Sequence, residues 1–462
     1  MNGVRRIVSI LNKFIPEVEK PSQRPSFKEK LGWTGVALML YYLLTQIPIY
    51  GIPKTAVDYL AGLRVIFAGA TGSIVELGIG PVVTAGIVME LLLGSKIIKL
   101  DLTDPEDRRF FQESQRVLAI FFILFENGTY ALGKYPTDPK MELIIILQMA
   151  LGSFLLMMLD DLVSKWGIGS GISLFILAGV AQKVLWDMFS PVKTSGGSIV
   201  GVIPALIMQG SSALYRPGMP DVVGLVATFV VFLLVIWAYQ IRIEVPIAHS
   251  MVGGQRMRYP IRLLYVSNVP IIFTSALVGD LEMVSRLVWT RFGNEGGWMR
   301  TLVDILGRWK IEGSSMIPVS GLAYYIQRPY SPSFLYSYPD AAAAYLLITV
   351  VGCILFAKIW VMTAGMDAST VAEQLVKQGI VLPGVRSSPK VVKATIERYI
   401  NAVTIVGGFL VGFLAAIADF TGALGTGSGI LLAVTIIASF YEVIMRERAL
   451  EVYPKIKRFL GG

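Results

Sequence analysis

Ten separate apolar stretches run through the chain, and each approaches the length of about 20 residues that a helix needs to cross a bilayer. They lie near residues 31–49, 76–98, 116–133, 141–162, 169–187, 221–241, 259–280, 341–362, 399–418 and 428–446. Charged residues make up only 16% of the chain, against about a quarter in soluble proteins. The sequence therefore predicts an all-α, polytopic membrane protein with ten transmembrane helices.

Basic residues gather in alternate loops between these stretches. Clusters of Lys and Arg lie near 96–109, 242–262, 377–398 and 446–458, and contribute to a net charge of +9. Because cytoplasmic loops of membrane proteins are enriched in Lys and Arg, this charge indicates orientation rather than nucleic-acid binding. It predicts a cell-membrane protein with both termini in the cytoplasm. The long external loop 281–340 escapes the rule, as long loops do.

The ten spans divide into two sets of five. Residues 31–187 would form an N-terminal half, 188–220 an external linker, and 221–462 a C-terminal half with a cytoplasmic tail. An odd number of spans in each half gives the halves opposite orientations, which is the topology of inverted repeats. Residues 1–30 are basic and carry apolar residues at helical spacing, which predicts an amphipathic helix on the cytoplasmic membrane surface.

Several motifs are absent or fail on their context. The chain has one His and one Cys, His249 and Cys353, which excludes a zinc-protease motif and an intrachain disulfide. The glycines of the 422–429 segment follow no strand and contain no Gly-Lys pair, so we interpret them as a tight turn between spans nine and ten. We expect no enzymatic activity, no cofactor and no metal.

Charged residues inside apolar stretches are costly and usually functional. Glu126 lies deep in the third stretch, whereas Asp280 lies near the external end of the seventh. Asp419 and Glu442 lie near the ends of stretches, and we expect both to be solvated.

Seven stretches together resemble the SecY/Sec-alpha family of protein-translocation channel subunits, and look most like its archaeal branch. They are LGIGPVVTAGIVMELL (77–92), WGIGSGISLFI (166–176), VPIAHS (245–250), YPIRLLYVSNVPII (259–272), PGVR (383–386), RYI (398–400) and ADFTGALGTGSGILLAVTI (418–436). They occur in order through nearly the whole chain. Each is weak alone, but together they are specific.

The resemblance implies two five-helix halves arranged as a clamshell around a central, hourglass-shaped pore. A ring of aliphatic side chains narrows the waist in this family, and its motif positions here are Ile79, Val83, Ile172, Ile176, Ile272 and Leu432. A constriction of this kind dewets and blocks ions. Without the resemblance, ordinary buried core is the preferred explanation of these residues. The segment 51–75, too polar to span, resembles the family's plug, which we place near 57–70.

The resemblance also implies a lateral gate and cytosolic docking loops. The polar cluster of the gate would be Thr84, Glu126 and Asp280, and Asp280 departs from the Asn that is usual there. Two facing carboxylates could share one proton across the closed gate; alternatively, Asp280 is solvated at the external rim and never meets Glu126. The docking loops would carry Arg256, Arg258 and Arg386.

The implied partners are a SecE-type subunit, a small single-span beta/SecG-type subunit, a ribosome or another cytosolic motor, signal sequences, nascent polypeptides and membrane lipids. A secondary transporter of small solutes remains the alternative, because ten spans in inverted halves also suit that class. A transporter would normally carry more ionisable residues near the bilayer midplane than this sequence does.

Overall fold

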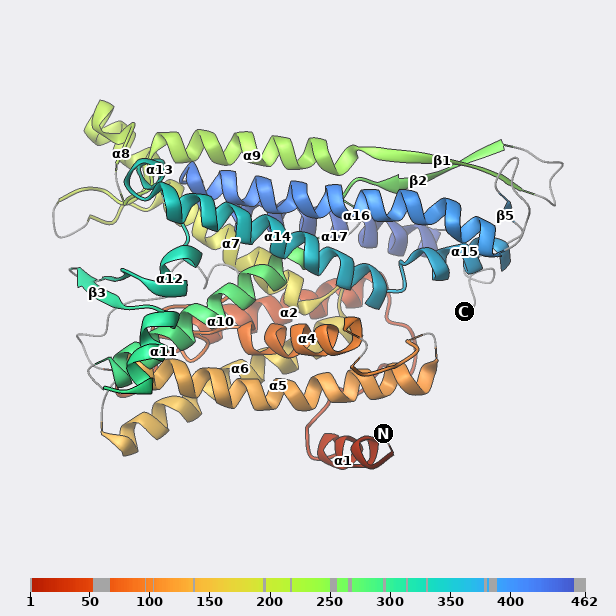
Figure 1. Ribbon diagram of the computed structural model, residues 1–462, viewed down its shortest axis with the longest axis horizontal. Coiled ribbons are helices and arrows are strands. Elements are labelled where there is room, and N and C mark those ends of the chain that lie inside the picture. The colour runs from red at the N-terminus through yellow and green to blue at the C-terminus, as the bar shows by residue number, and fades with distance from the viewer. Residues whose placement is uncertain are drawn as a thin grey trace.

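The computed structural model describes most of the chain. The described residues are 2–52, 67–95, 97–102, 104–135, 138–193, 197–216, 218–249, 256–264, 268–293, 296–312, 315–329, 331–377, 380–381 and 389–452. They form a bundle of long helices that run roughly along one axis (Figure 1). A long helix lies at each of the ten predicted places, which confirms the prediction of an all-α, polytopic architecture.

The long helices have these bounds: α2 (Phe27–Gln46), α4 (Gly80–Gly94), α5 (Pro105–Lys134), α6 (Pro139–Trp166), α7 (Gly171–Phe189), α9 (Val222–Gln240), α10 (Val269–Phe292), α14 (Pro339–Thr363), α16 (Pro389–Phe420) and α17 (Gly427–Val452). Among the described residues, seven helices are long and apolar enough to cross a membrane by length and composition alone. The other three are α2, α4 and α10, of which α4 has only 15 residues.

Local sequence signals fix where several helices begin. The Ser26 side chain caps α2, and Glu29 completes a capping box by accepting from the Ser26 N–H at 2.8 Å. Asp221 caps α9 by accepting from the Gly224 N–H at 2.7 Å. Proline occupies the first turn of α4, α5, α6, α10 and α14, where its missing N–H costs no intrahelical hydrogen bond.

Helix α10 joins two groups of helices. On one side it packs against α4 and α5, and on the other against α14, α16 and α17. Figure 1 shows α10 between the orange helices α4 and α5 and the blue helices α16 and α17. Glycines allow close packing in the second group, because a Cβ at Gly412 would lie only 2.8 Å from Val350 Cα. Small residues at helix contacts are typical of membrane bundles.

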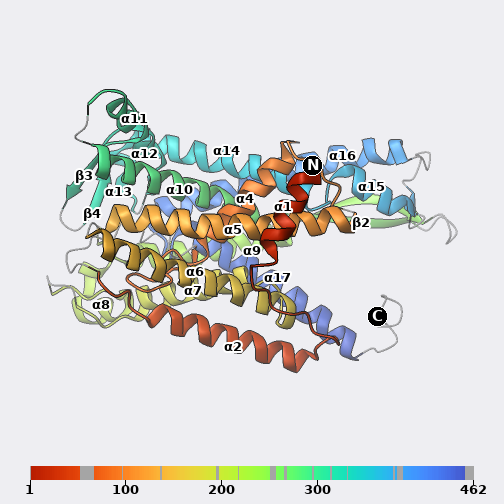
Figure 2. The same ribbon diagram turned by 90° about the horizontal axis from the view of Figure 1, so that it is seen from below.

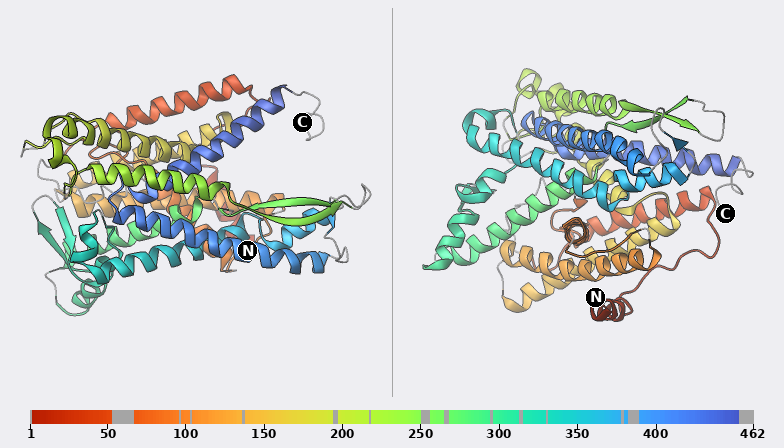
Figure 3. Two further views of the ribbon diagram at one scale, coloured as in Figure 1. Left: turned by 90° about the horizontal axis from the view of Figure 1, so that it is seen from above. Right: turned by 45° about the vertical axis from the view of Figure 1, so that its right-hand side comes forward.

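The two ends of the bundle differ. The end that we call the hairpin end carries the strands β1 (Arg242–His249), β2 (Arg256–Arg262) and β5 (Ile380–Val381), in the order β2-β1-β5, and helix α15 (Ala368–Lys377). The opposite end, which we call the α11 end, carries α8 (Val202–Gln209), η1 (Gly210–Ala213), α11 (Trp298–Leu306), the hairpin β3 (Trp309–Glu312) and β4 (Ser315–Pro318), α12 (Gly321–Ile326) and α13 (Ser333–Ser337). Figures 2 and 3 show both ends from other sides.

Two predictions about helix ends are wrong. The seventh apolar stretch was placed at 259–280, but Tyr259–Arg262 pair with β1 and α10 begins only at Val269. The apolar residues of β2 resemble the start of a helix in sequence, because the periodicity of a short apolar run does not distinguish a strand from a helix. Asp419 is not solvated, since its exposed fraction is 3% and its carboxylate accepts a hydrogen bond from the Tyr345 hydroxyl at 2.7 Å.

The amphipathic N-terminal helix is present as α1 (Asn2–Asn12), and it packs against α5. Arg5 pairs with Asp107 at 2.5 Å. In the segment after α1, Glu17 forms ion pairs with Lys165 at 2.6 Å and with Arg116 at 2.8 Å. Lys165 and Arg116 hold the pKa of the Glu17 carboxyl group below its ordinary value. The two ion pairs therefore stabilise the segment after α1 fully above that ordinary pKa, and the stabilisation is lost as the pH falls through the lowered pKa.

The turn between α16 and α17 depends on Asp419. Its second oxygen accepts from the Gly427 N–H at 2.8 Å, and Arg328 lies 3.7 Å from the carboxylate. Gly422 and Gly425 take positive φ angles in the same turn, which confirms the tight turn predicted from the glycines.

We predict that Asp419→Ala destabilises the fold by about 1–3 kcal/mol, because it leaves the Tyr345 hydroxyl and the Gly427 N–H unsatisfied in a buried site. Thermal unfolding in detergent measures the change. Asp419→Asn keeps an acceptor for the Gly427 N–H and should lose less. Equal unfolding midpoints for the parent and the Ala variant would contradict the prediction.

Candidate functional site

The segment before α4 is fixed by backbone contacts to its neighbours. The Ile79 N–H donates to the Phe67 carbonyl oxygen at 2.8 Å, and the Ile74 N–H donates to the Ile47 oxygen at 3.0 Å. Gly78 has a φ of +58°, and a Cβ there would overlap the Phe67 carbonyl. Only glycine combines that φ with so close an approach. The start of α4 and the chain at Phe67 are therefore held together.

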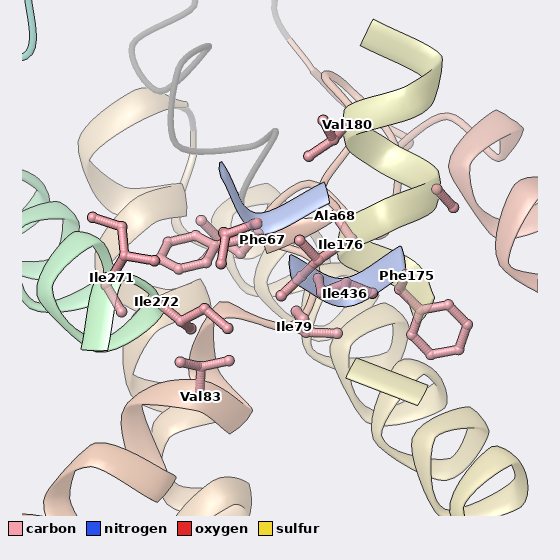
Figure 4. Packing of buried hydrophobic residues seen from close by; sticks show 14 of the residues in the cluster. Phe67, Ala68, Ile79, Val83, Phe175, Ile176, Val180, Ile271, Ile272 and Ile436 are labelled. Atoms are coloured by element: carbon pink, nitrogen blue, oxygen red, sulfur yellow. The ribbon is translucent and has the colours of Figure 1, made fainter. Parts of the chain in front are cut away.

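Side chains at the predicted ring positions belong to the central hydrophobic core, where Figure 4 shows Ile79, Val83, Ile176 and Ile272 near one another. Ile79, Val83, Ile176, Ile272 and Leu432 belong to one hydrophobic cluster, and each is at most 7% exposed. Ile172 is less buried and packs against this cluster. The six positions come from α4 and the residue before it, and from α7, α10 and α17. These residues, far apart in sequence, therefore contribute to one hydrophobic core, and their role as a ring stays a prediction.

Phe67 and Ala68 belong to the same cluster. Figure 4 shows the Phe67 ring beside Ile271 and Ile272, close to Ile79. Tyr41 donates a hydrogen bond to the Ala68 oxygen at 3.2 Å and stacks on Phe175 with ring centroids 5.2 Å apart. Of the predicted plug range 57–70, only 67–70 are described, and 57–66 lie outside the described residues. The described end of that range thus contacts the ring.

The predicted polar cluster also comes together, on α4, α5 and α10. The Thr84 hydroxyl lies 3.0 Å from Oδ2 of Asp280, and the Glu126 carboxyl group lies near both side chains. Glu126 is 3% exposed, and its Oε1 has no hydrogen-bond partner among the described residues. Asp280 lies mid-helix in α10, so its predicted place near the external end of the span, and the alternative of a solvated rim position, are wrong.

Close contacts join α4 to α14 nearer the hairpin end. A Cβ at Gly94 would lie 2.9 Å from Cγ2 of Ile359. On the α10 side, a Cβ at Gly352 would lie 2.7 Å from Cγ2 of Thr274. The predicted gate helices α4, α5, α10 and α14 therefore lie in direct contact.

The sequence reasoning missed a buried ionic group close to the start of α4. Glu76 pairs with Lys134 and accepts hydrogen bonds from the hydroxyl groups of Tyr130, at 2.9 Å, and Tyr135, at 2.6 Å. Glu76 and Lys134 are 0% and 4% exposed. The i, i+4 spacing of Tyr130 and Lys134 at the end of an apolar run was the available signal. This group ties the segment before α4 to the end of α5.

The predicted docking arginines are described only in part. Arg258 lies on β2, is exposed, and forms an ion pair with Glu244 on β1. Arg256 is the first residue of β2. Arg386 lies outside the described residues. In the part of the chain that the structure describes, no group of three His, Cys, Asp or Glu residues could hold a metal ion.

Comparison with known proteins agrees with this geometry. The SecY family model matches residues 73–441, and the model for the plug domain of Sec61p matches residues 39–72. The protein translocase subunit SecY of Pyrococcus horikoshii is 42% identical over 480 aligned residues, and that of Pyrococcus furiosus is 44% identical; each alignment covers 100% of both chains.

Solved structures show the same fold. The structure described as that of a protein-conducting channel has a TM-score of 0.81 at 35% identity, with 96% of this chain and 98% of that chain covered. Sec61 in the canine ribosome–channel complex from the endoplasmic reticulum has a TM-score of 0.78 at 34% identity, with the same coverage. With a matching family model over most of its length and full-length relatives above 30% identity, this chain belongs to the SecY family.

Proposed function

We propose that this chain is the central, pore-forming subunit of a Sec protein-conducting channel. Unfolded secretory polypeptides would cross the membrane through it, and helices of membrane proteins would leave it sideways into the lipid. The observation that carries this proposal is the central aliphatic cluster, in which the ring residues pack against Phe67. The relatives are described as protein translocase subunits, and a structural neighbour as a protein-conducting channel.

The ring would act as a seal in the resting state. Ile79, Val83, Ile172, Ile176, Ile272 and Leu432 are aliphatic, so a pore lined by them offers ions no replacement for their hydration shell. The side chains make no polar contacts that an entering polypeptide would have to break. Phe67 and Ala68 add a second layer, held to the ring by the hydrogen bond between the Ile79 N–H and the Phe67 carbonyl.

The contact of α4 and α5 with α10 and α14 would be the lateral gate. Thr84 and Asp280 join the two sides by a polar contact. An apolar segment that enters between these helices replaces the contacts between them. The helices then contact the segment and the lipid instead. The two halves, residues 31–187 and 221–462, would separate around the pore as inverted five-helix units, with 188–220 as the external linker.

Orientation and partners follow from charge and from exposed surface. The hairpin end would face the cytoplasm of the cell membrane, with both termini on that side, and would bind a ribosome or another motor. The structural neighbour Sec61 is described in a ribosome–channel complex. Outer helices such as α9 expose Phe229, Leu233 and Trp237. Such faces suit membrane lipids and the helices of SecE-type and single-span beta/SecG-type subunits.

The first prediction tests the seal. Ile79→Ser combined with Ile176→Ser should raise ion conductance in planar bilayers, because a hydroxyl-lined constriction wets more readily. Ile396→Ser with Val403→Ser is the control, since both residues are buried in a separate core between α15 and α16. If the ring variant conducts ions no better than the parent, the ring residues do not seal the pore.

The second prediction tests docking. Arg258→Glu and Arg386→Glu should each weaken ribosome binding, and the parent complex should weaken steeply with salt, because arginine contacts to phosphate release counterions. Arg300→Glu, on α11 at the opposite end, is the matched charge reversal. Binding that does not change with salt, or that falls equally in the Arg300 variant, would contradict docking at the hairpin end.

The third prediction tests the gate cluster. As the pH rises, Glu126 and Asp280 become two negative charges held close together, so repulsion should favour separation of α5 and α10. Engagement of signal sequences should therefore become easier at higher pH. Asp280→Asn removes one charge and should flatten this dependence, while Asp304→Asn, on α11, should not. Matching pH profiles for the parent and the Asp280 variant would exclude a shared proton.

A further inference from the structure

A large cleft opens at the hairpin end of the candidate gate. Its volume is about 1000 Å³, and its walls come from α4, the 98–102 segment, the start of α5, the end of α14 and the start of α15. The cleft therefore lies between the two sides of the gate. An entering chain would meet this space before it reaches the aliphatic ring.

The charged side chains that line the cleft differ in how deeply they are buried. Lys99, Asp101 and Arg108 line the cleft but are solvent-exposed, whereas Glu90 on α4 is 8% exposed. Exposed charges of both signs at the mouth are well solvated and select little. The deep wall thus carries a single acidic side chain.

The carboxyl group of Glu90 is incompletely hydrogen-bonded. The Thr363 hydroxyl of α14 lies within hydrogen-bonding reach of its carboxyl group. Its Oε2 is buried without a hydrogen-bond partner among the described residues. Leu93, Trp360 and Met362 give the cleft an apolar wall, and Gln112 and Gln115 of α5 line it with uncharged amides. A buried carboxylate oxygen with no partner is costly, so a cationic donor that reached it would be stabilised.

We propose that Glu90 receives an ammonium or guanidinium group from the basic segment that precedes the apolar core of an entering signal sequence. Such sequences begin with a basic region and continue with about 7–15 apolar residues. This inference rests on the proposed channel function, and it gives that function a specific recognition residue.

The shape of the cleft favours a polypeptide over a free metal ion. A hard cation such as Ca²⁺ needs 6–8 oxygen ligands, and Glu90 is the only buried carboxylate among the described residues that line the cleft. The volume admits several side chains, and the aromatic side chain of Trp360 lines the same space. The cleft matches a basic side chain followed by apolar ones.

The position of Glu90 couples this contact to the gate. Gly94 lies one turn further along α4 on the same face, where α4 touches Ile359 of α14. A basic group that binds between Glu90 and Thr363 therefore enters where the two helices meet. Binding at Glu90 would begin the separation that an apolar segment completes.

Site-specific crosslinking tests the inference in the reconstituted channel complex. The chain has one Cys, Cys353, which is buried, so Gln374→Cys at the wall of the cleft provides one reactive thiol. Two secretory substrates, called clients, share one apolar signal-sequence core and carry a cysteine in the segment before it. The lysine client has three lysines before the core, and the glutamine client has three glutamines there. A short bismaleimide joins client and channel.

Glu90→Gln keeps the size of the side chain and removes its charge. We expect it to lower the crosslinking of the lysine client about tenfold, which corresponds to about 1.4 kcal/mol, and to leave the glutamine client unchanged. Glu106→Gln, at an exposed acid of α5 outside the cleft, should change neither client. Glu90→Lys should restore crosslinking to a client that carries three glutamates before its core.

Other results would overturn the inference. If the Glu90→Gln channel crosslinks both clients equally less than the parent does, the role of Glu90 is structural. If it crosslinks both clients as well as the parent does, Glu90 does not recognise the basic segment. Both leave the channel function standing. Absence of crosslinks from either client to the parent channel would instead count against the proposed function itself.

Discussion

A single backbone contact organises the centre of this molecule. The Ile79 N–H bonds to the Phe67 carbonyl, and Gly78 makes this approach sterically possible. The contact fixes where α4 starts, and thereby sets Ile79 and Val83 against Ile176 and Ile272. Because Phe67 precedes α4 by only a short irregular segment, the same contact lays its ring on the aliphatic cluster. The proposed seal and the residues proposed to cover it are therefore held by the same hydrogen bond.

Buried charged groups in this molecule differ in whether their oxygen atoms have partners. Glu76 is satisfied by Lys134 and two tyrosines, and Asp419 by Tyr345 and the Gly427 N–H. Those groups hold parts of the structure together. Glu126 and Glu90 differ, since each keeps one oxygen without a partner among the described residues. Both lie on helices of the candidate gate, where a change of contacts would bring new partners.

Much of the candidate site could be predicted from the sequence, but through resemblance rather than through residue chemistry. Ile79, the residue before α4, and Val83 lie four residues apart, and motif positions predicted the other ring residues. The spacing of Tyr130 and Lys134 indicated a polar face at the end of α5, but nothing in the sequence identified Glu76 as the partner of Lys134, because the two are 58 residues apart. The position of Asp280 differs from the prediction for another reason: apolar residues that belong to β2 put the start of the predicted span at 259, ten residues before α10 begins at Val269.

Apolar length, the placement of charge and the glycines determined the class of protein, its helices and the turn between α16 and α17. These follow from the sequence because each depends on neighbours within one turn or one span. The tertiary structure alone decided which polar side chains meet across helices. Thr84 reaches Asp280, and Glu90 faces a cleft beside Thr363, because helices from distant parts of the chain pack together. Such contacts depend on packing geometry, which no local pattern in the sequence contains.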